Sequence, residues 1–199
     1  MRLIGDPFKR RPAERGQALV EFSLVIPIFM VIFLAIAEFA FVLTTKTGVT
    51  NASQDAVQLA AELGNSQYAD TTILQLVESD ISSPLDKNKI YSVEIVWTDS
   101  YGTVNNAEDM YRRTGSNSFP DGSATGVTLP YTPGTATYPA TSRCNHIAGC
   151  GPGKPLVDYI AVIITYKYTW ITPLPNFVGF GSSPPTFVQT SISRLEPIQ

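Results

Sequence analysis

The sequence predicts an α+β protein, in which a single N-terminal transmembrane helix extends into an amphipathic helix and packs on a small antiparallel β-sheet. Three observations support this prediction. Residues 22–43 form one apolar run, residues 49–63 repeat small apolar side chains at helical spacing, and three later segments have the composition of strands. The 199 residues therefore divide into a basic leader (1–16), a transmembrane and amphipathic helix (17–64) and an outer α+β module (65–199), which is large enough for one modest core.

The apolar run is as long as a bilayer is thick. Its only conventional polar residues are Ser23 and Glu38. As a helix the run rises about 33 Å, which exceeds a hydrocarbon core of about 30 Å. We therefore expect the lipid bilayer to be a permanent partner of the chain. A cleaved secretory signal is the alternative, but it has a shorter apolar region, of about 7–15 residues, followed by a small-residue cleavage site.

The distribution of charge predicts the orientation of this anchor. Five basic and two acidic residues precede Gly16, a net charge of +3, whereas nine basic and thirteen acidic residues follow Leu43, a net charge of −4. Lys and Arg near the membrane ends keep the basic side in the cytoplasm. We therefore expect a single-pass cell-membrane protein with a cytoplasmic N-terminus and its C-terminal module outside. Since no basic stripe follows the leader, we expect no nucleic-acid partner.

Helical patterns continue after the anchor. The amphipathic stripe consists of Val49, Ala52, Ala56, Leu59, Ala60 and Leu63, and Gly64 provides a stop. A second helix is predicted over residues 70–82, with Asp70 as its cap. A short helix is predicted over residues 105–113.

Strands are predicted over residues 90–98, 156–170 and 186–193, because these segments are rich in β-branched and aromatic side chains. In the first strand we expect Tyr91, Val93, Ile95 and Trp97 to share one face. Between the first two strands, residues 114–155 are rich in Gly, Pro, Ser and Thr and predict a long exposed loop without an assigned ligand.

The loop contains both cysteines, Cys144 and Cys150. Outside the cytoplasm such a pair is most simply a disulfide. A metal site built from Cys144, His146 and Cys150 is the alternative, although it lacks an evident fourth ligand. His146 is the single histidine and the carboxylates are scattered, so we expect no enzymatic activity and no cofactor.

Two carboxylates lie in or beside the apolar run. Glu21 can rest at the headgroup level, stabilised by the positive end of the helix. Alternatively, cleavage after Gly16 would place a new α-amino group on Gln17, one helical turn from Glu21, and the two charges could pair. Glu38 lies about 24 Å beyond Phe22 along the helix. It is either a headgroup-level residue near the outer interface or a polar contact to another membrane helix.

The N-terminal sequence resembles a known family. The segment Arg15-Gly16-Gln17-Ala18-Leu19-Val20-Glu21-Phe22, with the apolar run and the Ala-rich helix that follow, is similar to TadE-like proteins of tight-adherence (Flp, type IVc) pilus assembly. The ending, residues 190–197, is also similar to the close of that family. The resemblance implies a minor pilin-like (pseudopilin) subunit of an adhesive pilus, cut between Gly16 and Gln17 by a prepilin peptidase. It also implies that Glu21 is the carboxylate that pairs with the new N-terminus, and that other pilus-assembly or pilin-like subunits are partners.

Two other functions remain open at this point. The chain could be a membrane-tethered extracytoplasmic binding module unrelated to a filament, in which the loop 114–155 contacts a surface ligand. It could also be a membrane-anchored hydrolase, although the residues offer little support for catalysis.

Overall fold

The computed structural model describes residues 12–151, 156–173, 175, 179 and 183–196. Residues 1–11 of the predicted leader and 152–155 of the predicted loop lie outside this part. The chain forms two compact units. The first contains Met1–Phe41 and Trp170–Ser182, and the second contains Val42–Thr169 and Ser183–Gln199. The first unit thus combines the apolar helix with a segment far away in the sequence.

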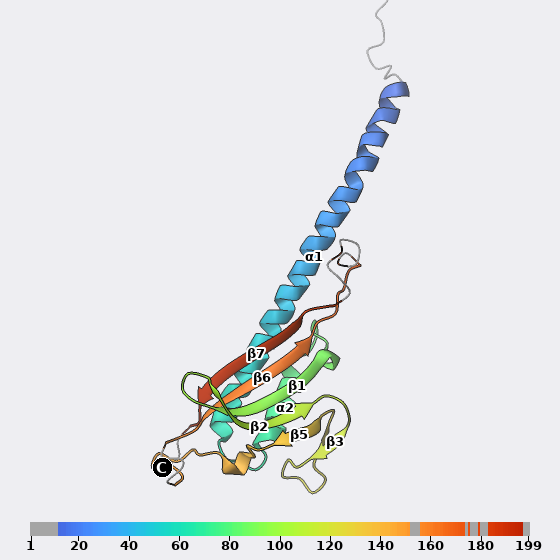
Figure 1. Ribbon diagram of the computed structural model, residues 1–199. Coiled ribbons are helices and arrows are strands. Elements are labelled where there is room, and N and C mark those ends of the chain that lie inside the picture. The colour runs from blue at the N-terminus through green and yellow to red at the C-terminus, as the bar shows by residue number, and fades with distance from the viewer. Residues whose placement is uncertain (1–11, 152–155, 174, 176–178, 180–182, 197–199) are drawn as a thin grey trace, which may run out of the picture. The chain divides into compact units, whose positions relative to one another are not determined.

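The N-terminal helix α1 (Pro12–Leu63) is continuous over 52 residues (Figure 1). Its last part belongs to the second unit and buries Val49, Ala52, Ala56 and Ala60 completely. This confirms four members of the predicted amphipathic stripe, whereas Leu59 and Leu63 are only half-buried. The small side chains let the helix approach the sheet closely enough for Ser53 Oγ to donate a hydrogen bond to the carbonyl oxygen of Val162, at 3.0 Å.

Gly64 ends α1, as the sequence predicts. Its φ of +55° is the left-handed conformation that follows many helices, and its N–H donates to the carbonyl oxygen of Ala60 at 3.2 Å. A Cβ atom at this position would lie 2.4 Å from Nδ2 of Asn145, so a larger residue would have to displace this side chain.

The second unit contains a five-stranded antiparallel sheet, which confirms the α+β class. The strand order is β5-β2-β1-β6-β7 (Figure 1). The strands are β1 (Ile90–Thr98), β2 (Val104–Arg112), β5 (Thr132–Ala136), β6 (Tyr159–Lys167) and β7 (Thr186–Arg194). Three of them, β1, β6 and β7, lie where strands are predicted.

The prediction of a helix over residues 105–113 is wrong, because residues 105–112 belong to β2. Ile95 pairs with Asp109 and Val93 pairs with Tyr111 along the neighbouring strand. Backbone pairing with a strongly apolar strand therefore outweighs the weak strand preference of a sequence rich in Asn, Asp and Glu.

The helix α2 (Ala69–Asp80) confirms the second predicted helix, but its predicted cap is wrong. Tyr68 occupies the N-cap position and makes no side-chain capping bond. Asp70 instead accepts a hydrogen bond from Tyr111 Oη at 2.8 Å and pairs with Arg143. The Asp70 carboxylate therefore makes tertiary contacts and does not cap the helix.

Much of the predicted loop 114–155 is ordered structure. It contains β3 (Asn117–Phe119) paired with β4 (Val127–Leu129), the edge strand β5 and the short 3-10 helix η2 (Ala140–Ser142). Another short 3-10 helix, η1 (Lys87–Lys89), directly precedes β1. Phe119, Leu129, Tyr131 and Tyr138 are buried and join the core. The aromatic residues spaced between the Gly and Pro residues thus supply apolar surface that the overall composition hides.

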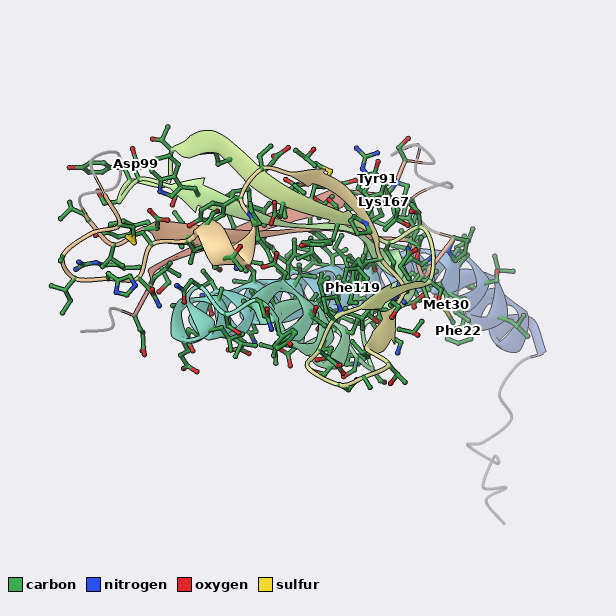
Figure 2. The ribbon with its side chains drawn as sticks, turned by 90° about the horizontal axis from the view of Figure 1, so that it is seen from below. Phe22, Met30, Tyr91, Asp99, Phe119 and Lys167 are labelled. Atoms are coloured by element: carbon green, nitrogen blue, oxygen red, sulfur yellow. A yellow bond between two sulfur atoms is a disulfide. The ribbon has the colours of Figure 1, made fainter. Side chains whose placement is uncertain are left out.

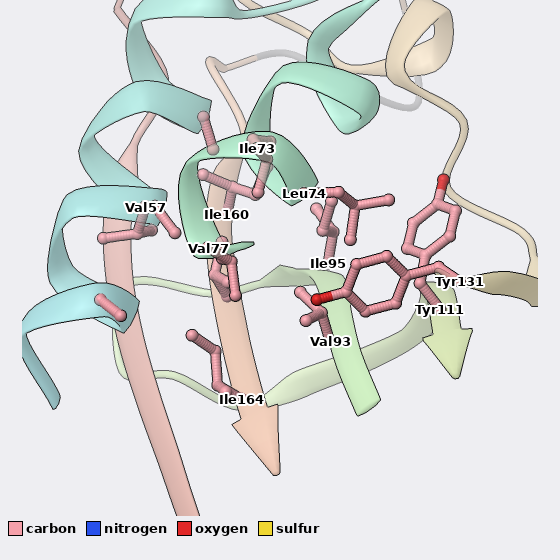
Figure 3. Packing of buried hydrophobic residues seen from close by; sticks show 14 of the residues in the cluster. Val57, Ile73, Leu74, Val77, Val93, Ile95, Tyr111, Tyr131, Ile160 and Ile164 are labelled. Carbon is pink, nitrogen blue, oxygen red and sulfur yellow. The ribbon is translucent and has the colours of Figure 1, made fainter. Parts of the chain in front are cut away.

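The core lies between one face of the sheet and the two helices. Figure 3 shows the side chains of α2 against those of β1 and β6. The fully buried members of this layer are Ile73, Leu74, Val77, Val93, Ile95, Ile160, Val162 and Ile164. Each large aliphatic side chain removed from water contributes roughly 1.5–3 kcal/mol, so this layer is the main source of stability of the second unit.

Tyr91 departs from the predicted face of β1. The register with β6 shifts between Ile90 and Ser92, and this irregularity turns Tyr91 outward while Val93 and Ile95 stay in the core. The ammonium group of Lys167 lies 3.7 Å from the centroid of the Tyr91 ring (Figure 2). A cation over the ring face thus covers part of the exposed aromatic surface.

Candidate functional site

The first candidate site is the apolar part of α1. Many large apolar side chains are exposed along the helix from Leu19 to Leu43, including Phe22 (65%), Phe33 (66%) and Phe39 (63%). Among the described residues, α1 is the one helix long and apolar enough to cross a membrane. Because the protein itself does not cover these side chains, a nonpolar environment must do so.

Gly16, Gln17 and Glu21 lie at the start of this apolar part. Gln17 Nε2 donates a hydrogen bond to Glu21 Oε1 at 3.0 Å, across one helical turn. All three residues are exposed. The structure therefore brings residue 17 and the Glu21 carboxylate together, although it does so through the side chain of Gln17.

Gly16 has no packing role in this structure. A Cβ atom built on it meets nothing within 4 Å. Gly within a helix is less favourable than Ala by roughly 0.5–1 kcal/mol. The fold alone therefore gives no reason for glycine at this position.

Glu38 is buried to 5% exposure within the first unit. Its Oε1 accepts the backbone N–H of Ile171 at 3.2 Å, and its Oε2 accepts the backbone N–H of Thr172 at 2.7 Å. Both of these N–H donors belong to the connection between β6 and β7, more than 130 residues away in the sequence. No local pattern could have identified these partners.

The comparison with protein families identifies this helix. Residues 16–58 match the family model of TadE-like proteins. The N-terminal segment of this chain is similar to TadE-like proteins. The matched residues begin at Gly16 and include both Glu21 and Glu38, which confirms the resemblance seen in the sequence. No curated protein and no solved structure matches the chain.

Beyond the TadE-like segment, Cys144 and Cys150 form a disulfide with a Cα–Cα distance of 5.7 Å. With both sulfur atoms bonded to each other, they are not available as the thiolates that a zinc site with His146 would need. No group of three or more His, Cys, Asp or Glu residues among those described could hold a metal ion. Cys144 is also fixed through its backbone, since its N–H donates to Asp158 Oδ2 at 2.8 Å.

A buried polar cluster joins α2, β2 and the segment after β5. The Arg143 side chain is fully buried, pairs with Asp70 and lies 3.9 Å from Asp109 Oδ2. Asp109 Oδ1 accepts the backbone N–H of Tyr138 at 2.9 Å. The cluster fixes ordered loop residues to the helix and to the sheet, and sequence analysis missed it because its members are far apart along the chain.

Burial dominates the electrostatics of this cluster. Desolvation raises the pKa of Asp109 from 3.8 to about 6, the nearby Asp70 carboxylate adds to the shift, and the Tyr138 N–H and the Arg143 guanidinium oppose it. Desolvation and Asp70 also raise the pKa of Tyr111, which keeps its hydroxyl protonated as a donor. These groups fix one another in position, so the cluster stabilises the packing of the segments that it joins.

Described residues of the second unit line two of its surface clefts. One, of about 540 Å³, lies between α1 and the edge strand β7 and is lined by Gln54, Val57, Gln58 and the residues 190–193. The other, of about 290 Å³, lies beside Asp70, Asp109 and Tyr111. The first has neutral walls, which suit contacts with another protein better than acid–base chemistry.

Proposed function

We propose that the protein is a membrane-anchored, pilin-like subunit that takes part in assembling or anchoring a tight-adherence type pilus. The match of residues 16–58 to the TadE-like family is the observation that carries this proposal. An apolar helix with many exposed large side chains suits both of the environments that such a subunit would meet. These are the lipid bilayer and the packed helices of neighbouring pilus subunits.

Processing after Gly16 by a prepilin peptidase is part of the proposal. Gly16 is exposed and has no packing role, so its identity is better explained by an enzyme that reads the chain than by the fold. A side chain at this position would lie where a peptidase must approach the backbone. The glycine therefore supports a recognition site.

Glu21 is the proposed pairing carboxylate. Cleavage would convert the backbone nitrogen of Gln17 into a charged amine one helical turn from Glu21, and a charge at a membrane boundary needs a partner. The existing bond from Gln17 Nε2 to Glu21 Oε1 supports this pairing, because residue 17 already lies within reach of the carboxylate. In a filament the same carboxylate could receive the amine of a neighbouring subunit.

The outer module acts through protein contacts in this proposal, without a catalytic step. Because the basic leader keeps the N-terminal end of α1 on the cytoplasmic side, the helix would present the module on the outer side of the membrane. The buried cluster around Arg143 supports a structural use of its carboxylates, since they are paired or bonded within the fold.

Three variants in the native host test this proposal. Gly16→Leu should block processing, so that the intact mass of the purified chain retains residues 1–16, and Glu21→Ala should reduce the number of surface pili. Ser23→Ala is the control, because it removes only the exposed bond from Ser23 Oγ to the carbonyl oxygen of Val20. It should leave both the mass and the pilus count unchanged.

Deletion of the whole chain gives the decisive comparison. Two results together would overturn the proposal and support a tethered binding module. These are normal pilus numbers in the deletion strain and an unprocessed chain in the membrane of the undeleted strain. Loss of pili on deletion with normal processing of the native chain is the expected result.

A further inference from the structure

We propose that the segment Trp170–Pro173, between β6 and β7, inserts into the outer interface of the bilayer beside α1, where Glu38 holds it. The segment would be a second membrane contact of the chain, made by lipid headgroups and upper acyl chains. This inference rests on the anchoring role of α1 in the proposed function, and it does not depend on a pilus.

The depth of Glu38 places the segment. Glu38 lies about 24 Å beyond Phe22 along the helix, within a hydrocarbon core of about 30 Å and near its outer edge. Its carboxylate oxygens lie within hydrogen-bond distance of the backbone nitrogens of Ile171 and Thr172. These two residues therefore sit at the same depth as Glu38 when α1 spans the membrane.

The contact satisfies two groups that lipid would otherwise disfavour. A carboxylate in the membrane needs a partner, and irregular backbone at that depth needs acceptors for its N–H groups. Glu38 is only 5% exposed, and both of its carboxylate oxygens accept backbone N–H groups of this segment. Each partner removes the cost of placing the other in the interface.

The composition of the segment fits the interface. No charged side chain occurs from Tyr168 to Pro185, whereas the connection from β1 to β2 contains Asp99. Trp170 is half-buried, and Ile171 is 59% exposed although it is a large apolar residue. Trp is enriched at membrane interfaces because its ring is apolar and its N–H is polar.

The two tryptophans of the chain allow a direct test. In the full-length chain reconstituted in phosphatidylcholine vesicles, Trp97→Phe leaves Trp170 as the single emitter, and Trp170→Phe leaves Trp97 in β1 as the control. Acyl chains brominated near the headgroup should quench Trp170 emission by about twofold or more, because the ring lies at the interface. The same lipids should leave Trp97 emission nearly unchanged.

Glu38 variants in the Trp97→Phe background test the contact of the Glu38 carboxylate with the backbone of Ile171 and Thr172. Glu38→Ala removes both acceptors and should abolish most of the lipid quenching of Trp170, while making the ring accessible to acrylamide. Glu38→Gln keeps one carbonyl acceptor and should give an intermediate result. Retention of each variant in the vesicles after alkaline washing shows separately whether α1 still anchors the chain. Loss of the membrane anchor and loss of the Glu38 contact therefore give different results.

The inference is overturned if Trp170 is quenched by acrylamide and not by brominated lipid while the chain stays in the vesicles. Protection of Trp170 from both quenchers would also overturn it, since another protein surface would then cover the segment. If Trp97→Phe does not fold, the native-sequence chain labelled with 5-fluorotryptophan gives the same comparison by ¹⁹F NMR with a paramagnetic lipid, and the same two results would overturn the inference.

Discussion

As the pH rises, the Asp109→Asn variant should lose less stability than the native chain. Asn has nearly the same shape and can still accept the backbone N–H of Tyr138 at its Oδ1, but it does not titrate. Asp109 itself is 3% exposed and faces Asp70, Arg143 and Tyr111, with Tyr138 bonded to its carboxylate. The substitution therefore removes one buried ionisable group and few contacts.

The size of the effect follows from the pKa of Asp109, which is raised from 3.8 to about 6, chiefly by desolvation. A raised pKa means that the native state holds this proton at pH values where the unfolded chain has lost it. The resulting stability is fully present below about pH 4 and is lost as the pH rises through about 6. Between about pH 4 and about pH 7, the free energy of unfolding of the native chain should therefore fall by about 2 kcal/mol through this group. The Asn variant lacks this decrease.

Urea titrations of both full-length chains in a non-ionic detergent, followed by tryptophan fluorescence, measure this difference. The free energy of unfolding of the Asn variant minus that of the native chain should increase by about 2 kcal/mol from pH 4 to pH 7, with equal urea dependence in both chains. A difference that stays constant within about 0.5 kcal/mol would refute the reasoning, because Asp109 would then titrate alike in both states.

Further substitutions test the core packing and the disulfide by the same urea titration. Leu74→Ala opens a cavity in the core and should lower the free energy of unfolding by about 2–5 kcal/mol, whereas Gln58→Ala, on the exposed side of α1, should change it by less than about 0.5 kcal/mol. Ala56→Leu should cost about 1–3 kcal/mol or more, because Ala56 has no exposed surface and α1 lies close to the sheet; a neutral result would contradict this packing. Replacing Cys144 and Cys150 together by Ala should cost about 2 kcal/mol and remove any effect of a thiol reductant, and a reductant effect that persists would contradict the disulfide assignment.

Local patterns predicted the elements that they alone determine. The apolar run and the small-residue stripe predicted α1, because lipid and the sheet each select side chains at helical spacing. The strands β1, β6 and β7 were predicted because β-branched and aromatic residues dominate them. Gly16, Gln17 and Glu21 could be related to one another in the same way, since one helical turn separates the last two.

Contacts between distant residues decided the features that sequence reasoning missed. Asp70 is not a helix cap because Tyr111 and Arg143, 41 and 73 residues away, bind its carboxylate. Residues 105–112 form a strand because β1 supplies the backbone partners. Glu38 is buried by a segment 133 and 134 residues further along. In each case the partner is fixed by the tertiary fold, and no spacing within the sequence encodes it.

Alkaline carbonate extraction of membranes from the native host tests the central claim most directly. If α1 spans the bilayer, the full outer module should remain in the membrane pellet after washing and should dissolve only with detergent. Release of the module into the supernatant without detergent would show that the apolar helix is not a retained anchor, and would contradict the account.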